Sequence, residues 1–192
     1  MLRILLLVSL FFFPIKSNAL IEVDITRGNL NPLPIAVSPL SIDENSQKNF
    51  EKILKKKNIG SEIAIVVENN LKASGLFNPL NRDAFLQAPD IANLKPRFED
   101  WNLIKAQALS TGKVNFVNDK LRVEFRLWDV LAGKEMLALA FTTVPSNWRR
   151  VGHIITDKVY ERLTGEKGYF DTRIIYVSEE GPKTRRIKKL AI

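Results

Sequence analysis

Apolar and charged residues alternate most regularly over residues 121–128, which is the two-residue period of a half-buried β-strand. Residues 131–134 supply a glycine-containing turn and residues 135–144 return as a second strand, so this stretch predicts an antiparallel hairpin. Residues 106–116 are rich in β-forming types, and residues 35–37 form a short apolar run bounded by prolines. We expect these two segments to be strands of the same sheet.

Two longer segments have the spacing of an amphipathic helix. The first, residues 61–75, offers a serine as N-cap and ends in glycine, and the second, residues 146–165, is bounded in the same way. Pro96 can open a short helix between them, whereas residues 81–95 are polar and predicted to be irregular. The pattern therefore predicts one α/β domain over residues 30–165, with a small mixed sheet of about five strands covered by two main helices.

Residues 43–60 differ in composition from the rest of this domain. They hold five lysines against three acidic residues. The spacing of Phe50, Ile53 and Leu54 is compatible with a weak amphipathic helix. The favoured interpretation is a solvated insertion whose few apolar residues attach it to the body, because three apolar residues are too small a face for a membrane surface.

The last part of the chain does not belong to this pattern. Residues 173–177 predict a strand, residues 178–182 a turn and residues 186–192 a further strand. A single hairpin of this kind is marginal alone and leaves unpaired edges. We expect the opening of a β-rich domain whose remainder is missing from the chain.

The first 19 residues have the anatomy of a secretory signal peptide, with a basic start, a ten-residue apolar core and small residues before a cut after Ala19. A core of that length is too short to cross about 30 Å of hydrocarbon as a helix. Cleavage removes Arg3 and Lys16 and lowers the formal net charge from +8 to +6. An exported chain meets no genomic DNA, so the basic charge does not indicate a nucleic-acid partner.

The new N-terminus would begin with a second alternating segment. Its apolar and polar positions are Leu20, Ile21, Glu22, Val23, Asp24, Ile25, Thr26 and Arg27. From the pattern alone, the favoured interpretation is a first strand of the domain sheet. The alternative is a detachable strand that pairs with the sheet edge of another protein.

No constellation of residues indicates catalysis or a metal or cofactor site. The sequence has no cysteine and a single histidine, and it lacks phosphate-loop, zinc-protease and nucleophile-elbow motifs. His153 is interpreted as a helix-face residue that can pair with Asp157. Trp101, Trp128 and Trp148 are interpreted as core or interface anchors.

Three stretches carry a resemblance to a known family. They are residues 20–28, residues 71–80, and residues 150–165 together with the 168–177 segment that follows. In order and spacing they resemble the N-terminal portion of the TolB family, periplasmic β-propeller proteins of the Tol-Pal cell-envelope system. The Lys-rich segment is longer than the corresponding loop of that family, so no role is transferred to it.

The resemblance implies a periplasmic binding protein and no enzyme. Residues 20–29 would be the partner-binding strand, docking by β-augmentation on the C-terminal domain of TolA, in support of outer-membrane integrity and cell division. Residues 166–192 would be the first strands of a truncated propeller. The lipoprotein Pal, which binds the family's propeller, is therefore not an expected partner of this chain, and no membrane insertion is expected after leader cleavage. The alternative is a stand-alone periplasmic α/β domain with a ligand-binding or enzymatic role.

Overall fold

A computed structural model describes Ile21 and residues 31–173 and 175–191. Its main sheet has six strands, five of which run in the order β3-β1-β4-β5-β6, while the short β2 pairs with β4. The strands are β1 (Leu33–Val37), β2 (Ser41–Ile42), β3 (Phe77–Pro79), β4 (Ala108–Val117), β5 (Lys120–Asp129) and β6 (Lys134–Thr143). The pairs β1–β3, β1–β4 and β2–β4 are parallel, and β4–β5–β6 is an antiparallel meander. The predicted mixed sheet and its hairpin are thus confirmed.

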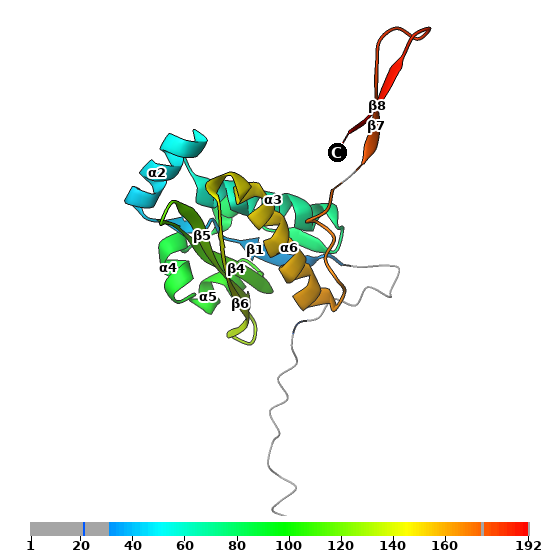
Figure 1. Ribbon diagram of the computed structural model, residues 1–192. Helices are drawn as coiled ribbons and strands as arrows, with labels where there is room; N and C mark the ends of the chain where they lie inside the picture. Colours follow the sequence, from blue (N-terminus) through cyan, green and yellow to red (C-terminus); the bar gives the residue numbers. More distant parts are fainter. Residues whose placement is uncertain (1–20, 22–30, 174, 192) are drawn as a thin grey trace, which may run out of the picture.

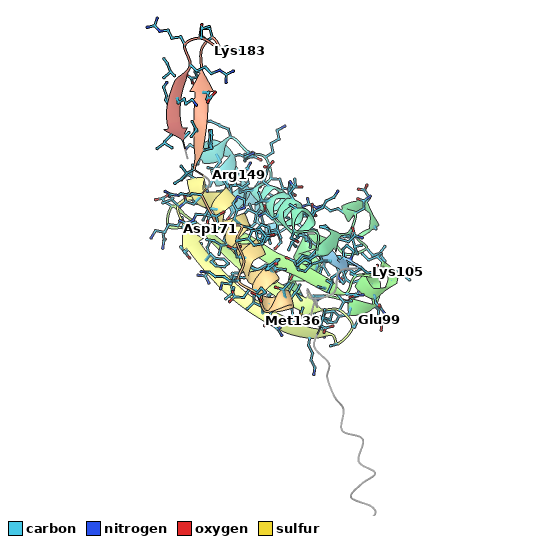
Figure 2. All side chains as sticks on the ribbon, turned by 90° about the vertical axis from the view of Figure 1, so that its right-hand side faces the viewer. Glu99, Lys105, Met136, Arg149, Asp171 and Lys183 are labelled. Carbon is cyan, nitrogen blue, oxygen red and sulfur yellow. The ribbon has the colours of Figure 1, made fainter. Side chains whose placement is uncertain are left out.

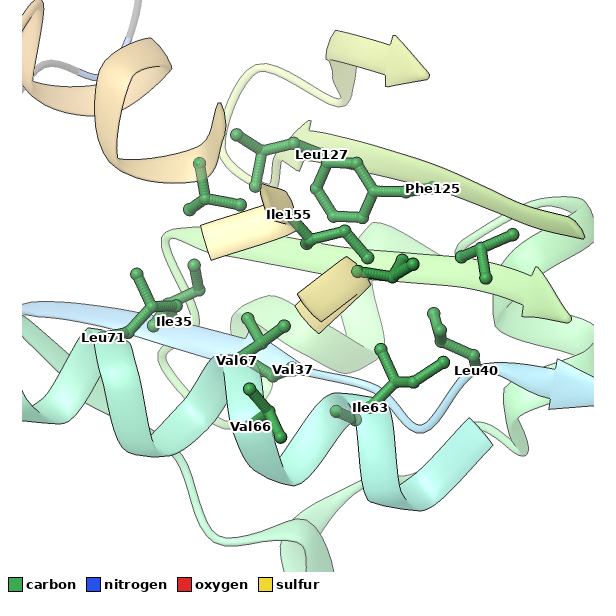
Figure 3. Packing of buried hydrophobic residues seen from close by; sticks show 14 of the residues in the cluster. Ile35, Val37, Leu40, Ile63, Val66, Val67, Leu71, Phe125, Leu127 and Ile155 are labelled. Atoms are coloured by element: carbon green, nitrogen blue, oxygen red, sulfur yellow. The ribbon is translucent and has the colours of Figure 1, made fainter. Parts of the chain in front are cut away.

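Two helices cover one face of this sheet (Figure 1). They are α3 (Ile59–Ala73) and α6 (Trp148–Thr164). Val66 and Val67 of α3 pack toward Val37 of β1, and Ile155 of α6 lies over Leu127 of β5, within one buried cluster (Figure 3). The prediction of two main helices on a small sheet is confirmed.

Close contact between α3 and α6 depends on a glycine. A Cβ atom on Gly152 would lie 2.8 Å from Cγ1 of Val66 and 2.9 Å from its Cβ. Since real side chains essentially never approach so closely, only glycine allows the two helices this separation.

The helix starts differ from those expected. Asn58 caps α3, its side chain accepting a hydrogen bond from the backbone N–H of Ser61 at 3.0 Å, so the helix begins at Ile59 and Ser61 is inside it. A short 3₁₀ turn, η3 (Pro145–Asn147), precedes α6, which has no side-chain cap bond, so the expected cap at Ser146 is wrong. The end of α6 is as predicted, because Gly165 adopts a left-handed φ of 75°.

The Lys-rich segment is the amphipathic helix that its spacing allowed and not only a solvated insertion, while its expected attachment to the body through a few apolar residues is confirmed. It forms α2 (Glu44–Leu54), capped by Asp43, whose carboxylate accepts a hydrogen bond from the backbone N–H of Ser46. Hydrogen bonds from the Ser46 backbone and side chain lower the pKa of Asp43. Phe50 is fully buried and meets Phe116 edge to face at 5.3 Å. The helix is therefore fastened to β4 by a buried aromatic pair.

The opposite face of the sheet carries a second, smaller cluster. Alternate residues of a strand point to opposite faces, so Ala36 joins this cluster while its neighbours Ile35 and Val37 join the main one. It is covered by α4 (Pro89–Leu94) and by α5 (Phe98–Leu103), which contributes Trp101. The short helix after Pro96 is thus confirmed.

The expectation that residues 81–95 are irregular is wrong in part, because η2 (Arg82–Ala84) and α4 lie within them. Proline at the first position of α4 explains this, since the fixed φ of proline suits the start of a helix.

The C-terminal residues form a separate two-stranded sheet of β7 (Tyr176–Glu180) and β8 (Ile187–Ala191). The first strand lies at Tyr176–Glu180 and not at the expected residues 173–177, so both its bounds and the turn that follows are later than predicted. Tyr176, Val177 and Leu190 are all more than half exposed. Within the described ranges, no helix is long and apolar enough to span a bilayer.

Candidate functional site

Of the predicted partner-binding residues 20–27, the structure describes only Ile21. The others, Leu20, Glu22, Val23, Asp24, Ile25, Thr26 and Arg27, lie outside the described residues, as does the whole leader. Ile21 is half-buried and packs against the main hydrophobic cluster. This one side chain therefore shows which surface residue 21 contacts.

Ile21 lies in a groove of about 550 Å³ between the last turns of α6 and strand β6. Leu137 and Leu139 of β6 contribute its apolar wall, and Gly165 ends it at the close of α6. A Cβ atom added at Gly165 would meet no atom within 4 Å, so the groove is open at that point. The groove can therefore bind an aliphatic side chain against its apolar wall.

Charged side chains of α6 form the rim of the groove. Lys158 and Glu161 are joined by a 2.8 Å ion pair, and the hydrogen bond from Lys158 lowers the pKa of Glu161. The guanidinium Nε of Arg162 donates to the carbonyl of Met136 at 3.2 Å, which ties α6 to β6. The apolar wall and the mixed-charge rim suit a segment in which apolar and charged residues alternate.

Strand β6 is an edge of the sheet. In the described part of the chain it pairs with β5 alone. Its inward residues, such as Leu137 and Leu139, are partly covered, whereas Ala138 and Ala140 are exposed. An unpaired edge of small residues leaves its backbone N–H and C=O groups accessible to a further strand.

Comparison with known proteins settles the family. The family model described as "TolB amino-terminal domain" matches residues 21–136. The chain belongs to the TolB amino-terminal domain family. It is also 82% identical over 187 residues to "Tol-Pal system protein TolB" of Pelagibacter ubique, a match that covers 97% of this chain and 42% of that protein. The chain therefore spans less than half the length of this curated relative.

Among solved structures, the chain is similar to TolB from Acinetobacter baumannii, with a TM-score of 0.64 at 23% identity. That match covers 90% of this chain and 39% of the other. At this identity the likeness shows a shared fold, and it agrees with the α/β assignment of this TolB-family chain.

The single histidine of this TolB-family chain has a structural role in its helix pair. Nδ1 of His153 accepts a hydrogen bond from the side-chain amide of Asn70 at 2.8 Å. Asp157 instead accepts from the backbone N–H groups of Phe170 and Asp171, so the expected pairing of His153 with Asp157 is wrong. Within the residues described here, no group of three or more His, Asp or Glu side chains could hold a metal ion.

The three tryptophans of the TolB-family domain are packing residues. Trp101 and Trp148 are buried, and the indole N–H groups of Trp101 and Trp128 are bonded to Gln87 and Thr111. Of the predicted alternatives, core or interface anchors, the core role is confirmed for Trp101 and Trp148, whereas Trp128 is half-buried.

The groove is not evident from the amino-acid sequence. The alternation of Leu137 and Leu139 in the second hairpin strand is visible there, and so are the charged positions of the last helical turns. Their juxtaposition depends on how the helix crosses the sheet, which periodicity does not determine.

Proposed function

We propose that this chain is the amino-terminal part of a periplasmic component of the Tol-Pal cell-envelope system and acts by binding proteins, without catalysis. Its membership of the TolB amino-terminal domain family carries this proposal, supported by the 82% identity to a protein named for that system. Residues 1–19 direct export and are removed after Ala19. The system to which it contributes maintains outer-membrane integrity and supports cell division.

The partner-binding element is the N-terminal strand, residues 20–27, which docks on the C-terminal domain of TolA. The mode is β-augmentation, in which backbone groups of the strand extend a sheet of the partner and alternate side chains fill its pockets. The alternation of Ile21, Val23 and Ile25 with polar residues supplies one apolar face for those pockets.

In this proposal the same strand also docks on its own domain. Ile21 lines the groove between α6 and β6 and packs on the main cluster. A strand that occupies this groove is withheld from the partner, so the apparent affinity for TolA is reduced by the fraction of time the strand is docked. The N-terminal strand thus acts as a switch whose position a further ligand can bias.

The remaining segments have distinct roles in this proposal. Residues 30–165 form the α/β domain that carries the groove, and residues 166–192 open the β-propeller of the family. Pal binds the propeller, so Pal is not a partner of residues 1–192 alone. The exposed apolar residues of the β7–β8 hairpin, such as Val177 and Leu190, support this assignment because they provide a surface for further strands.

Deleting residues 20–27 tests the proposal. We expect loss of binding to the TolA C-terminal domain, measured by calorimetric titration, with thermal unfolding of the domain almost unchanged. The fold accounts for the second expectation, since the two buried clusters are built from residue 33 onward. An unaltered affinity in the deleted protein would refute the assignment of the strand.

A second variant tests the backbone contribution. Val23→Pro removes one N–H donor from the strand and should weaken binding, whereas Val23→Ala keeps that donor and serves as the matched control. Equal binding by the proline and alanine variants would show that side chains alone make the interface.

A further inference from the structure

A second, polar pocket lies at the opposite end of α6 from the groove. It encloses about 370 Å³ and is formed by the start of the helix and by residues 171–173, which return past it. Figure 2 shows Arg149 and Asp171, one from each of these segments, near each other. Neither the family assignment nor the partner-binding strand accounts for this pocket.

The pocket carries an excess of positive charge. Arg149, Arg150 and Arg173 line it together with one carboxylate, that of Asp171. Arg150 and Asp171 form a two-pronged pair, with Nε to Oδ1 at 3.0 Å and Nη2 to Oδ2 at 3.1 Å. The charges of Arg150 and Asp171 therefore cancel. Within the described residues, the guanidinium groups of Arg149 and Arg173 have no carboxylate partner.

A further cation lies beside the pocket. Arg149 and Lys56 each lie 5.0 Å from the ring centre of Trp148. These contacts hold the two cationic heads near the same indole without neutralising them. Lys56 is paired with Glu62 at 3.0 Å, whereas Arg149 has no such pair in the described part of the chain. Its guanidinium is therefore available to an anion.

Neutral donors complete the lining of the pocket. Ser146 and Thr172 contribute hydroxyl groups. His153 also lines it, and because its Nδ1 accepts the hydrogen bond from Asn70, its Nε2–H is the donor left for a ligand. Guanidinium, hydroxyl and imidazole donors from two segments can serve several oxygens at once. A carboxylate needs only one guanidinium fork, whereas a phosphate group uses a wider set of donors.

We propose that this pocket binds a phosphate group, carried either by a soluble phosphate ester or by the headgroup of an anionic phospholipid. The two unpaired guanidinium groups, of Arg149 and Arg173, hold the phosphate oxygens. Arg150 is fixed by Asp171 and shapes the wall. The hydroxyl and imidazole donors provide the remaining hydrogen bonds.

Titration of the purified protein with glycerol 3-phosphate at low salt tests the proposal. We expect saturable binding of glycerol 3-phosphate. The double substitution Arg149→Gln with Arg173→Gln should weaken this binding by about tenfold or more, because it removes two charge-assisted contacts. The matched control is Lys120→Gln with Lys134→Gln, which removes the same charge from exposed ends of the β5 and β6 strands. Thermal unfolding verifies that both variants are folded.

Vesicles distinguish the two sources of phosphate. Binding to vesicles that contain phosphatidylglycerol but not to phosphatidylcholine alone, lost in the arginine variant, would assign a lipid headgroup. Binding of glycerol 3-phosphate without vesicle binding would assign a soluble ester, and either result supports the site. Three results would overturn it: no phosphate binding, equal binding of glutamate or of an acidic peptide, or an equal loss in the lysine control.

Discussion

Substituting Phe50 by alanine tests whether the Lys-rich segment is a structural part of the domain. Phe50 is 0% exposed, and its ring meets that of Phe116 edge to face. Truncating a fully buried phenylalanine costs about 3–5 kcal/mol of unfolding free energy, of which the aromatic pair contributes about 0.5–1.5 kcal/mol. A segment without a buried contact to the domain would lose almost nothing from the same change.

The matched control is Ile53→Ala in the same helix. Ile53 is 50% exposed, so its truncation should alter the unfolding free energy by no more than about 0.5 kcal/mol. Urea unfolding measures both values, and hydrogen exchange over residues 44–54 shows whether α2 opens alone or with the domain. Wild-type stability and exchange in the Phe50→Ala variant would refute the attachment of α2 to β4.

Two further predictions concern the helix pair and the cap of α2. Gly152→Val should lower the unfolding midpoint by the equivalent of about 1–3 kcal/mol, because the new side chain collides with Val66, and an unchanged midpoint would contradict the close approach of α3 and α6. Asp43→Ala should cost about 0.5–2 kcal/mol at neutral pH, measured by urea unfolding. Hydrogen bonds from Ser46 lower the folded-state pKa of Asp43 below its ordinary 3.8, so this contribution is present above that pH and disappears as the pH falls through the folded-state pKa. A deficit that persists at lower pH would disprove the role of the ionised carboxylate.

The sheet and its two main helices were predictable because their apolar residues repeat with the right periods. The alternation over residues 121–128 reappears as alternating burial along β5, and Gly165 ends α6 with a left-handed φ. The attachment of α2 through its few apolar residues was predicted, but the partner of Phe50 was not, because Phe50 and Phe116 are far apart in the chain. Local pattern carries no information about such a contact.

The candidate site, too, was predictable from the sequence only in part. From the amino-acid sequence, the alternation predicts that residues 20–27 form a strand, and the family resemblance alone favours a partner-binding role for it. The groove that holds Ile21 could not be foreseen, since it arises where α6 crosses the edge of the sheet. Similarly, Asp157 lies at the right spacing from His153 on the same helix. The packing of α3 against α6 nevertheless places Asn70 next to His153, and Asn70 makes the hydrogen bond.

The switch proposed for the N-terminal strand is tested most directly by the affinity of a groove variant for the TolA C-terminal domain. Leu139→Glu places a charge in the apolar wall of the groove that Ile21 also lines, while Thr142→Glu adds the same charge at an exposed position of the same strand. Releasing the strand from its own domain removes the competition, so Leu139→Glu should bind TolA severalfold more tightly than the wild-type chain and the Thr142→Glu control. An affinity equal to or weaker than wild type, in a variant that unfolding shows to be folded, would contradict the switch.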